Sequence, residues 1–172
     1  MRPEGATTAR TDAAPPPPTL PTRFGPVALD EDRLITFDDG LLGFAGRRRY
    51  LLADPPRLGQ GGPFRLLQAA DDGEELAFLV LPLDAERGPV ARDDLRAACD
   101  GLGIAFADLA VLAIVTARRG GDGRVGFTVN LRAPLLLDAA RRRGRQHVLS
   151  DPSYGLRHAL PLPADAAGAE GA

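Results

Sequence analysis

The sequence contains a single cysteine, Cys99, and no lysine among its 172 residues. One cysteine cannot form an internal disulfide, and a chain of this size without disulfides fits a reducing compartment. All 21 basic residues are arginine, and the formal net charge of -2 gives no overall attraction to nucleic acid or to an anionic membrane. Any role of that kind has to come from a local cluster of arginines.

Long apolar runs are also missing. The longest, around Leu109 to Val115, is far shorter than the roughly 18 residues that a transmembrane helix needs. The first residues carry Arg2, Glu4 and Arg10 where a secretory signal has an apolar segment. We therefore expect a cytoplasmic protein that makes no membrane contact.

The groups that carry catalysis or bind metals are scarce. His147 and His158 are the two histidines, and together with one cysteine they make a poor ligand set for zinc. Ser153 lies in Asp-Pro-Ser-Tyr-Gly, which lacks the leading glycine of a nucleophile elbow and indicates a turn. The inventory for catalysis is thin, although an enzyme remains a third class of hypothesis, and we expect no metal site and no cofactor.

The composition that remains, 44% hydrophobic and 26% charged, is typical of one globular domain. Residues 1–22 are rich in Thr, Ala and Pro and include the run Pro15 to Pro18, so we predict a disordered Pro-rich tail. Residues 164–172 form a second disordered tail of small residues. The folded domain is then 23–163, and we expect a monomer.

Short apolar segments separated by Gly, Pro and Asp indicate strands joined by turns. They predict a mainly β fold, a small antiparallel β-barrel-like domain with one short helix. The segment Leu76 to Leu81 is apolar on both faces, as in a strand covered on both sides. The other expected strands are Phe24 to Leu29, Leu34 to Phe37, Tyr50 to Ala53, Phe64 to Ala69 and Ala110 to Ala117.

The one helix is predicted by the spacing of Leu95, Ala98, Cys99 and Leu102, which lines a single helical face. Asp93 or Asp94 is the expected N-cap, and Gly101 or Gly103 the expected end. Cys99 then faces the core as a small buried side chain rather than a reactive thiol.

The stretch from Phe127 to Leu149 contains most of the sequence signals. Phe127 to Arg132 alternates like a strand with one solvated face, and Leu135 to Leu137 is apolar enough to be buried. Gly144 among Arg141 to Arg145 indicates an exposed reversal, and His147 to Leu149 a second short strand. We expect a hairpin with a basic tip that Gly144 closes, and we expect Asn130 to tie its strand to a neighbouring loop.

Two clusters, Arg47 to Arg49 and Arg141 to Arg145, could bind phosphates through their guanidinium groups. Arg141 and Arg145, followed by Asp151 and Ser153, also resemble the cyclic-di-GMP site of PilZ domains, in a different arrangement along the chain. An RNA-binding or cyclic-di-GMP-binding β-barrel is therefore the alternative hypothesis. The acidic pairs Asp38-Asp39 and Asp71-Asp72 adjoin glycines and indicate solvated turns.

The chain resembles the flagellar assembly factor FliW family between Phe24 and about Leu160. The resemblance rests on a series of short segments in the same order and at the same spacing. One position departs from the family, because Leu42 stands where proline is frequent. The segments are Ile35-Thr36-Phe37, Gly40-Leu41-Leu42-Gly43-Phe44, Pro63-Phe64 with Leu67-Gln68, Leu76 to Val80, Asp108 to Leu112, Thr128 to Pro134, and Gly144-Arg145-Gln146.

This resemblance implies a small β-barrel-like fold and a non-enzymatic regulator in the bacterial cytoplasm. It implies two protein partners, the RNA-binding carbon storage regulator CsrA and flagellin, and no direct contact with nucleic acid. CsrA is expected to be basic, so acidic loops can steer it while an apolar residue anchors it, whereas the amphipathic terminal helices of flagellin would seek an apolar surface. The candidate partner-binding residues are Asp38, Asp39, Phe44, Asp71, Asp72, Asn130, Arg145 and Gln146.

Overall fold

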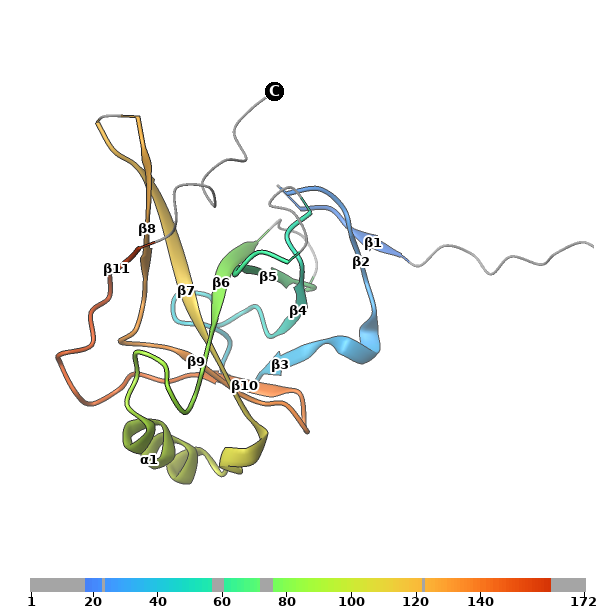
Figure 1. Cartoon of the computed structure of the whole chain (residues 1–172). Helices are drawn as coiled ribbons and strands as arrows, with labels where there is room; N and C mark the ends of the chain where they lie inside the picture. Colours follow the sequence, from blue (N-terminus) through green and yellow to red (C-terminus); the bar gives the residue numbers. More distant parts are fainter. Residues whose placement is uncertain (1–17, 23, 57–60, 72–75, 122, 162–172) are drawn as a thin grey trace, which may run out of the picture.

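The structure, a computed structural model, describes residues 18–22, 24–56, 61–71, 76–121 and 123–161 (Figure 1). The predicted tails at 1–17 and 162–172 lie outside the described residues. The strands are β1 (Thr19–Leu20), β2 (Val27–Ala28), β3 (Ile35–Phe37), β4 (Arg49–Ala53), β5 (Arg65–Ala69), β6 (Ala77–Leu83), β7 (Leu109–Arg119), β8 (Val125–Val129), β9 (Leu135–Asp138), β10 (Arg143–Gln146) and β11 (His158–Leu160). The helix is α1 (Arg92–Leu102), and Glu31–Arg33 and Phe106–Asp108 form 3-10 turns.

Seven strands close into a barrel in the order β7-β6-β5-β4-β3-β10-β9, and β9 pairs back onto β7. The predicted class, a mainly β barrel with one short helix, is confirmed. The pairing of β10 with β3 is parallel, with Arg143 opposite Thr36 and Gly144 opposite Phe37, whereas the other pairings are antiparallel. The barrel therefore closes where an early strand meets a late one.

Alternate residues of the barrel strands pack into different cores, which explains their continuous apolar sequences. Leu135 and Leu137 of β9 point into the barrel with Phe37 and Tyr50, while Leu136 packs outside against the helix side. The expectation for β6 is met in the same way, because Phe78 and Val80 join the inner core and Leu79 and Leu81 the outer one. Val80 is fully buried, and the residues beside it are half-buried.

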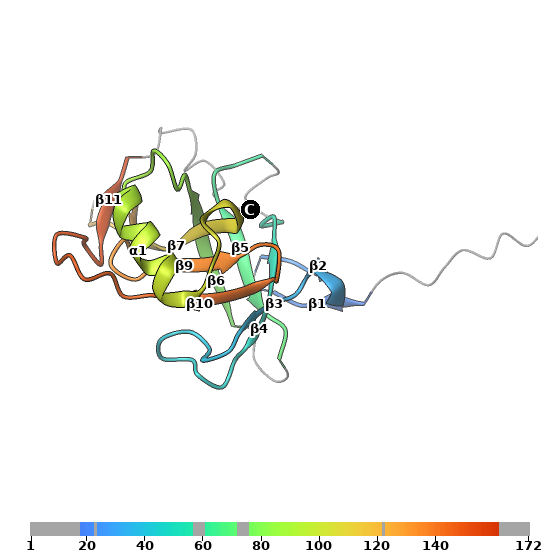
Figure 2. The same cartoon turned by 90° about the horizontal axis from the view of Figure 1, so that it is seen from below.

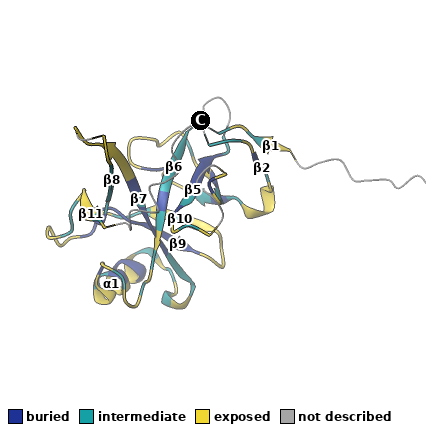
Figure 3. Ribbon diagram, turned by 45° about the horizontal axis from the view of Figure 1, so that its top comes forward, coloured by how far each residue is buried: buried dark blue, intermediate teal, exposed yellow. Residues whose placement is uncertain are grey.

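Helix α1 covers the outer face of the barrel with one side and exposes the other (Figure 3). Leu95, Ala98 and Cys99 are buried, and Gly103 ends the helix in a left-handed conformation, as predicted. The predicted N-cap is wrong: Ala91 occupies that position and makes no side-chain cap hydrogen bond. Within the described part of the chain, this is the longest helix, and none is long and apolar enough to cross a membrane.

The chain is ordered earlier than the boundary at residue 23 predicts. Strand β1, inside the segment expected to be a tail, pairs with β2. Leu20 packs with Val27, Leu51 and Leu66 on the outer face of β4 and β5. Burial of Leu20 against these residues stabilises the pairing of β1 with β2.

The hairpin between β9 and β10 also differs from the prediction. The reversal lies at Ala139 to Arg142, where Arg142 has a positive φ of 51°, and β10 begins inside the arginine cluster. Gly144 is therefore a strand residue, and His147 to Leu149, predicted as a strand, follows β10 without regular secondary structure. A Cβ at Gly144 would lie within 2.7 Å of Phe37 Cε1, so close packing requires the glycine there, not a turn.

Candidate functional site

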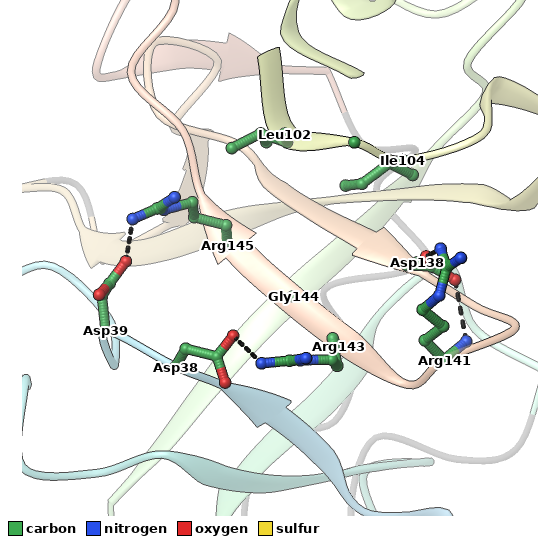
Figure 4. Close-up of a pocket in the computed structure, with 10 residues that line it drawn as sticks. Asp38, Asp39, Leu102, Ile104, Asp138, Arg141, Arg143, Gly144 and Arg145 are labelled. Atoms are coloured by element: carbon green, nitrogen blue, oxygen red, sulfur yellow. Dashed lines mark hydrogen bonds and ion pairs between the residues drawn. The ribbon is translucent and has the colours of Figure 1, made fainter. Parts of the chain in front are cut away.

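Two ion pairs join the end of β3 to β10 (Figure 4). Arg143 Nη2 lies 2.5 Å from Asp38 Oδ2, and Arg145 Nη2 contacts Asp39 Oδ2. The parallel register places alternate residues of β10 beside the two residues that follow β3, so arginines two apart reach aspartates one apart. The predicted acidic turn and the predicted basic tip are thus parts of one cluster.

A cavity of about 400 Å³ lies beside these pairs, between β10 and the end of α1. Its walls combine three aspartates and three arginines with the apolar side chains of Leu102 and Ile104. The lining residues are Asp38, Asp39, Leu102, Gly103, Ile104, Asp138, Arg141, Arg143, Gly144 and Arg145.

Asp138 supports the β9–β10 turn at one side of this cavity. It is buried, and it accepts hydrogen bonds from the Arg141 amide at 2.9 Å and from Arg141 Nη1 at 2.6 Å. These two bonds, the amide bond first, hold the pKa of Asp138 below its ordinary value. Arg141 is thereby directed along its own turn, and its charge is compensated locally.

The cavity is poorly suited to phosphate, because each of its three arginines already faces an aspartate. An incoming phosphate would have to compete with carboxylates that lie within hydrogen-bond distance of the same guanidinium groups. The formal charges of the lining residues sum to zero. This arrangement weakens the hypothesis that Arg141 to Arg145 bind RNA or cyclic-di-GMP.

Gln146 connects the loop after β3 to the turn between β8 and β9. Its Oε1 accepts a hydrogen bond from the Leu42 amide at 2.9 Å, and its Nε2 donates to the Ala133 carbonyl at 3.2 Å. A side chain that bonds two backbone groups from separate loops fixes their relative position. Gln146 is therefore a positioning residue for the loop from Gly40 to Gly46.

That loop carries two exposed apolar side chains. Leu42 is 59% exposed and Phe44 40% exposed, and the Phe44 ring packs edge-on against Phe78 with 5.3 Å between centroids. The loop extends away from the barrel (Figure 2). Gly40 and Gly43 both have positive φ, and a Cβ at Gly40 would lie 2.6 Å from the Phe44 carbonyl oxygen. The glycines thus build a turn that presents Leu42 and Phe44 to solvent.

Asp71 organises the start of β4. Its Oδ2 accepts hydrogen bonds from the amides of Arg48 and Arg49, and its Oδ1 accepts one from Arg49 Nε at 3.0 Å. Burial acts to raise the pKa of Asp71, but these hydrogen bonds outweigh it and lower the pKa below its ordinary value. Asp72 lies outside the described residues.

Asn130 has a local role at the end of β8. Its Oδ1 accepts a hydrogen bond from the Ala133 amide at 3.0 Å, which closes the turn leading to β9. The turn also supplies the Ala133 carbonyl that Gln146 bonds. The neighbouring loop is thus reached through Gln146 and not by Asn130 itself.

A second hollow, of about 300 Å³, runs between α1 and the segment after β10. Ala97 and Gly101 line its helix side, and His147 and Leu149 the other. Burial and, to a lesser extent, the charge of Arg145 hold the pKa of His147 below its ordinary value. The imidazole is therefore neutral at physiological pH.

The N terminus of α1 depends on Tyr154, a residue that no sequence pattern marked. The Tyr154 hydroxyl accepts a hydrogen bond from the Ala91 amide at 2.9 Å and donates to Asp94 Oδ2 at 2.6 Å. The bond to Asp94, and after it burial, raise the pKa of Tyr154, while the bond from the Ala91 amide acts to lower it. Tyr154 thus attaches the start of α1 to the segment before β11 through Ala91 and Asp94.

The predicted residues therefore fall into three places. Asp38, Asp39, Phe44, Arg145 and Gln146 lie together around the end of β3, whereas Asp71 supports β4 and Asn130 the β8–β9 turn. Leu42 is the exposed residue that the sequence reasoning missed, because the flanking glycines do not distinguish it from the buried Leu41. Among the described residues, no three His, Cys, Asp or Glu side chains are grouped to hold a metal ion.

Comparison with protein families gives one match over most of the chain. The family model described as FliW protein matches residues 19–160. That range begins at β1 and ends with β11, so it covers the whole barrel and its helix.

Curated relatives with the same name have similar sequences. The flagellar assembly factor FliW of Natranaerobius thermophilus is 33% identical over 146 residues, covering 80% of this chain and 87% of the relative. That of Syntrophotalea carbinolica is 36% identical over 149 residues, covering 83% and 97%. A crystal structure of a flagellar assembly factor FliW superimposes with a TM-score of 0.63 at 21% identity, covering 86% of this chain and 99% of the other, which shows that the fold is shared.

Proposed function

This chain belongs to the FliW family of flagellar assembly factors, and from that premise we propose that it is a non-enzymatic regulator of flagellin synthesis. It acts in the bacterial cytoplasm as a monomer and binds two proteins in turn, flagellin and the carbon storage regulator CsrA.

The regulation is an exchange of partners. Flagellin that has not been exported occupies the protein. When export removes flagellin, the protein is free to bind CsrA, which then loses its hold on flagellin mRNA, and translation resumes. This exchange requires that bound flagellin lowers the affinity of the protein for CsrA, and that bound CsrA lowers its affinity for flagellin to the same extent.

The family match is the observation that carries this proposal. The structure supports it by what it offers to a partner. The loop with Leu42 and Phe44 exposes apolar surface on a fixed turn, which is characteristic of protein interfaces. By contrast, the candidate catalytic groups have structural surroundings. Cys99 is buried, and the Ser153 amide donates a hydrogen bond to Asp151 Oδ1 within a turn.

Direct binding of RNA or cyclic-di-GMP remains the alternative class, with Arg47 to Arg49 and Arg141 to Arg145 as its contacts. The ion pairs of Arg141, Arg143 and Arg145 count against it. A nucleic-acid binder that neutralises phosphates would also lose affinity steeply as salt rises.

A competition experiment tests the proposal. CsrA from the source organism is bound to labelled flagellin leader RNA, and this protein is added with and without flagellin. We expect release of RNA by the protein and suppression of that release by flagellin. Tight, salt-sensitive binding of the RNA or of cyclic-di-GMP by the protein alone would instead support the alternative, and failure to bind either protein partner would refute the proposal.

A further inference from the structure

We propose that the Gly40 to Gly46 loop is the docking surface for an amphipathic helix whose apolar stripe is bordered by acidic side chains. The inference rests on the proposed function, in which the partner with amphipathic helices is flagellin. It assigns this loop to flagellin and places the main contact with CsrA elsewhere.

The apolar part of the surface consists of Leu42 and Phe44. Two other large apolar side chains are exposed in the described structure. Val148 closely follows β10, and Leu156 lies in the loop before β11. Leu42 and Phe44 differ because they stand two residues apart on one turn, with Phe44 backed by the Phe78 ring. Two neighbouring side chains of this kind can anchor one apolar stripe of a helix.

The loop is held in place before any partner arrives. The Phe44 amide donates to the Leu41 carbonyl at 2.7 Å, and the Leu42 amide donates to Gln146. Leu41 itself is buried in the barrel core. A turn that is already ordered loses little conformational entropy on binding, so its two apolar side chains can contribute most of their burial energy to affinity.

The charged groups around the loop determine which helix fits. Asp38, Asp39 and Asp71 each accept a hydrogen bond from an arginine side chain, so their negative charge is compensated. Arg48 is exposed and forms no ion pair within the described residues. Arg49, Arg143 and Arg145 offset these three aspartates, and Arg48, four residues after Phe44, adds an exposed positive charge.

Arg143 and Arg145 are already paired with Asp38 and Asp39, so the positive charge open to a partner is that of the exposed Arg48. This charge favours a helix with acidic side chains along the border of its apolar stripe. A basic partner gains nothing comparable here, because the acidic residues that would steer it are already paired.

The experiment measures the affinity of the full chain for two probes, synthetic peptides of the terminal helices of the organism's flagellin and its purified CsrA. The test variant is Leu42→Ser with Phe44→Ser. The matched control, Val148→Ser with Leu156→Ser, removes the same number of exposed apolar side chains elsewhere. Leu42→Ser alone is included because it leaves the Phe44–Phe78 contact intact, and thermal unfolding confirms that each variant is folded.

We expect the test variant to bind the flagellin peptides about tenfold or more weakly, as loss of interface anchors does, with CsrA binding unchanged and the control like wild type. Arg48→Glu should weaken peptide binding further at low salt. Equal effects of test and control variants, or loss of CsrA binding alone, would overturn the inference while leaving the proposed function intact. If wild type binds neither probe, the proposed function fails and the inference fails with it.

Discussion

Gly144 lies against the Phe37 ring without room for a side chain. A Cβ at residue 144 would stand 2.7 Å from Phe37 Cε1 and 2.5 Å from Leu137 Cδ2. Phe37 and Leu137 are both buried in the inner core, so neither can move freely aside. The contact lies where β10 meets β3, the parallel pairing that closes the barrel.

Gly144→Ala should therefore destabilise the domain. Overpacking of this kind costs about 1–3 kcal/mol, since ring and strand must separate to admit the methyl group. Urea unfolding measures the change. The control is Gly126→Ala in β8, where the nearest atom to the added Cβ is 4.0 Å away, and which should be neutral or slightly stabilising. Equal effects at the two glycines would contradict the packing argument.

Tyr154→Phe should loosen the N terminus of α1. The change removes the hydrogen bond from the Ala91 amide and the one to Asp94, and we expect a loss of about 1 kcal/mol in the free energy of unfolding. Amide exchange of the first helical turn should rise with it. Asp93→Asn, in the same turn, serves as control because Tyr154 bonds the carboxylate of Asp94. Unchanged exchange in the Tyr154 variant would show that the helix does not depend on this hydroxyl.

The other tyrosine should behave in the opposite way. Tyr50 is fully buried, its hydroxyl has no hydrogen-bond partner among the described residues, and burial, with a smaller contribution from Asp71, raises its pKa to about 12. Tyr50→Phe removes a buried polar group that gains nothing in the folded state, so stability should be unchanged or higher by up to about 1 kcal/mol. Thermal unfolding of both Phe variants side by side decides the contrast. A clear loss of stability in Tyr50→Phe would reveal a partner for the hydroxyl.

Asp71 should contribute to stability in a pH-dependent way. Because its pKa is lower in the folded state than in the unfolded chain, its contribution is present above the unfolded pKa of about 4 and is lost as pH falls through the folded value. Asp71→Asn should lower the melting temperature at neutral pH, and the difference from wild type should shrink in acid. Melting curves across this range test the prediction, and a difference that stays constant into strong acid would show that the carboxylate charge is not responsible.

Local pattern was sufficient for much of the fold. The 3.6-residue spacing of Leu95, Ala98, Cys99 and Leu102 predicted α1, and the apolar runs predicted strands β3 to β7, because those signals report burial of one face. The predictions were wrong where the local conformation depends on a contact with a residue distant in sequence. Gly144 is required by Phe37, and the N terminus of α1 by Tyr154, and neither partner is near in sequence.

The same reason limits what could be said of the site. Asp38 and Asp39 have the sequence of a solvated turn, and Arg143 and Arg145 that of a basic tip. The sequence therefore predicted two separate charged loops. Their compensation depends on the register of two strands from opposite ends of the domain, which no local pattern encodes. Phe44 was predicted as a partner contact, whereas Leu42 was not, because the pattern Gly40-Leu41-Leu42-Gly43 does not show which leucine is buried.

The parallel closure also constrains how the protein is made. Strand β3 leaves the ribosome early, yet its partner β10 is among the last strands synthesised, so the barrel stays open until translation has passed Gln146. Pairings between residues so far apart in sequence fold slowly, since a long loop has to be closed before the contact forms. Until then Phe37 and Leu135, which the finished barrel buries completely, are accessible to solvent and to chaperones.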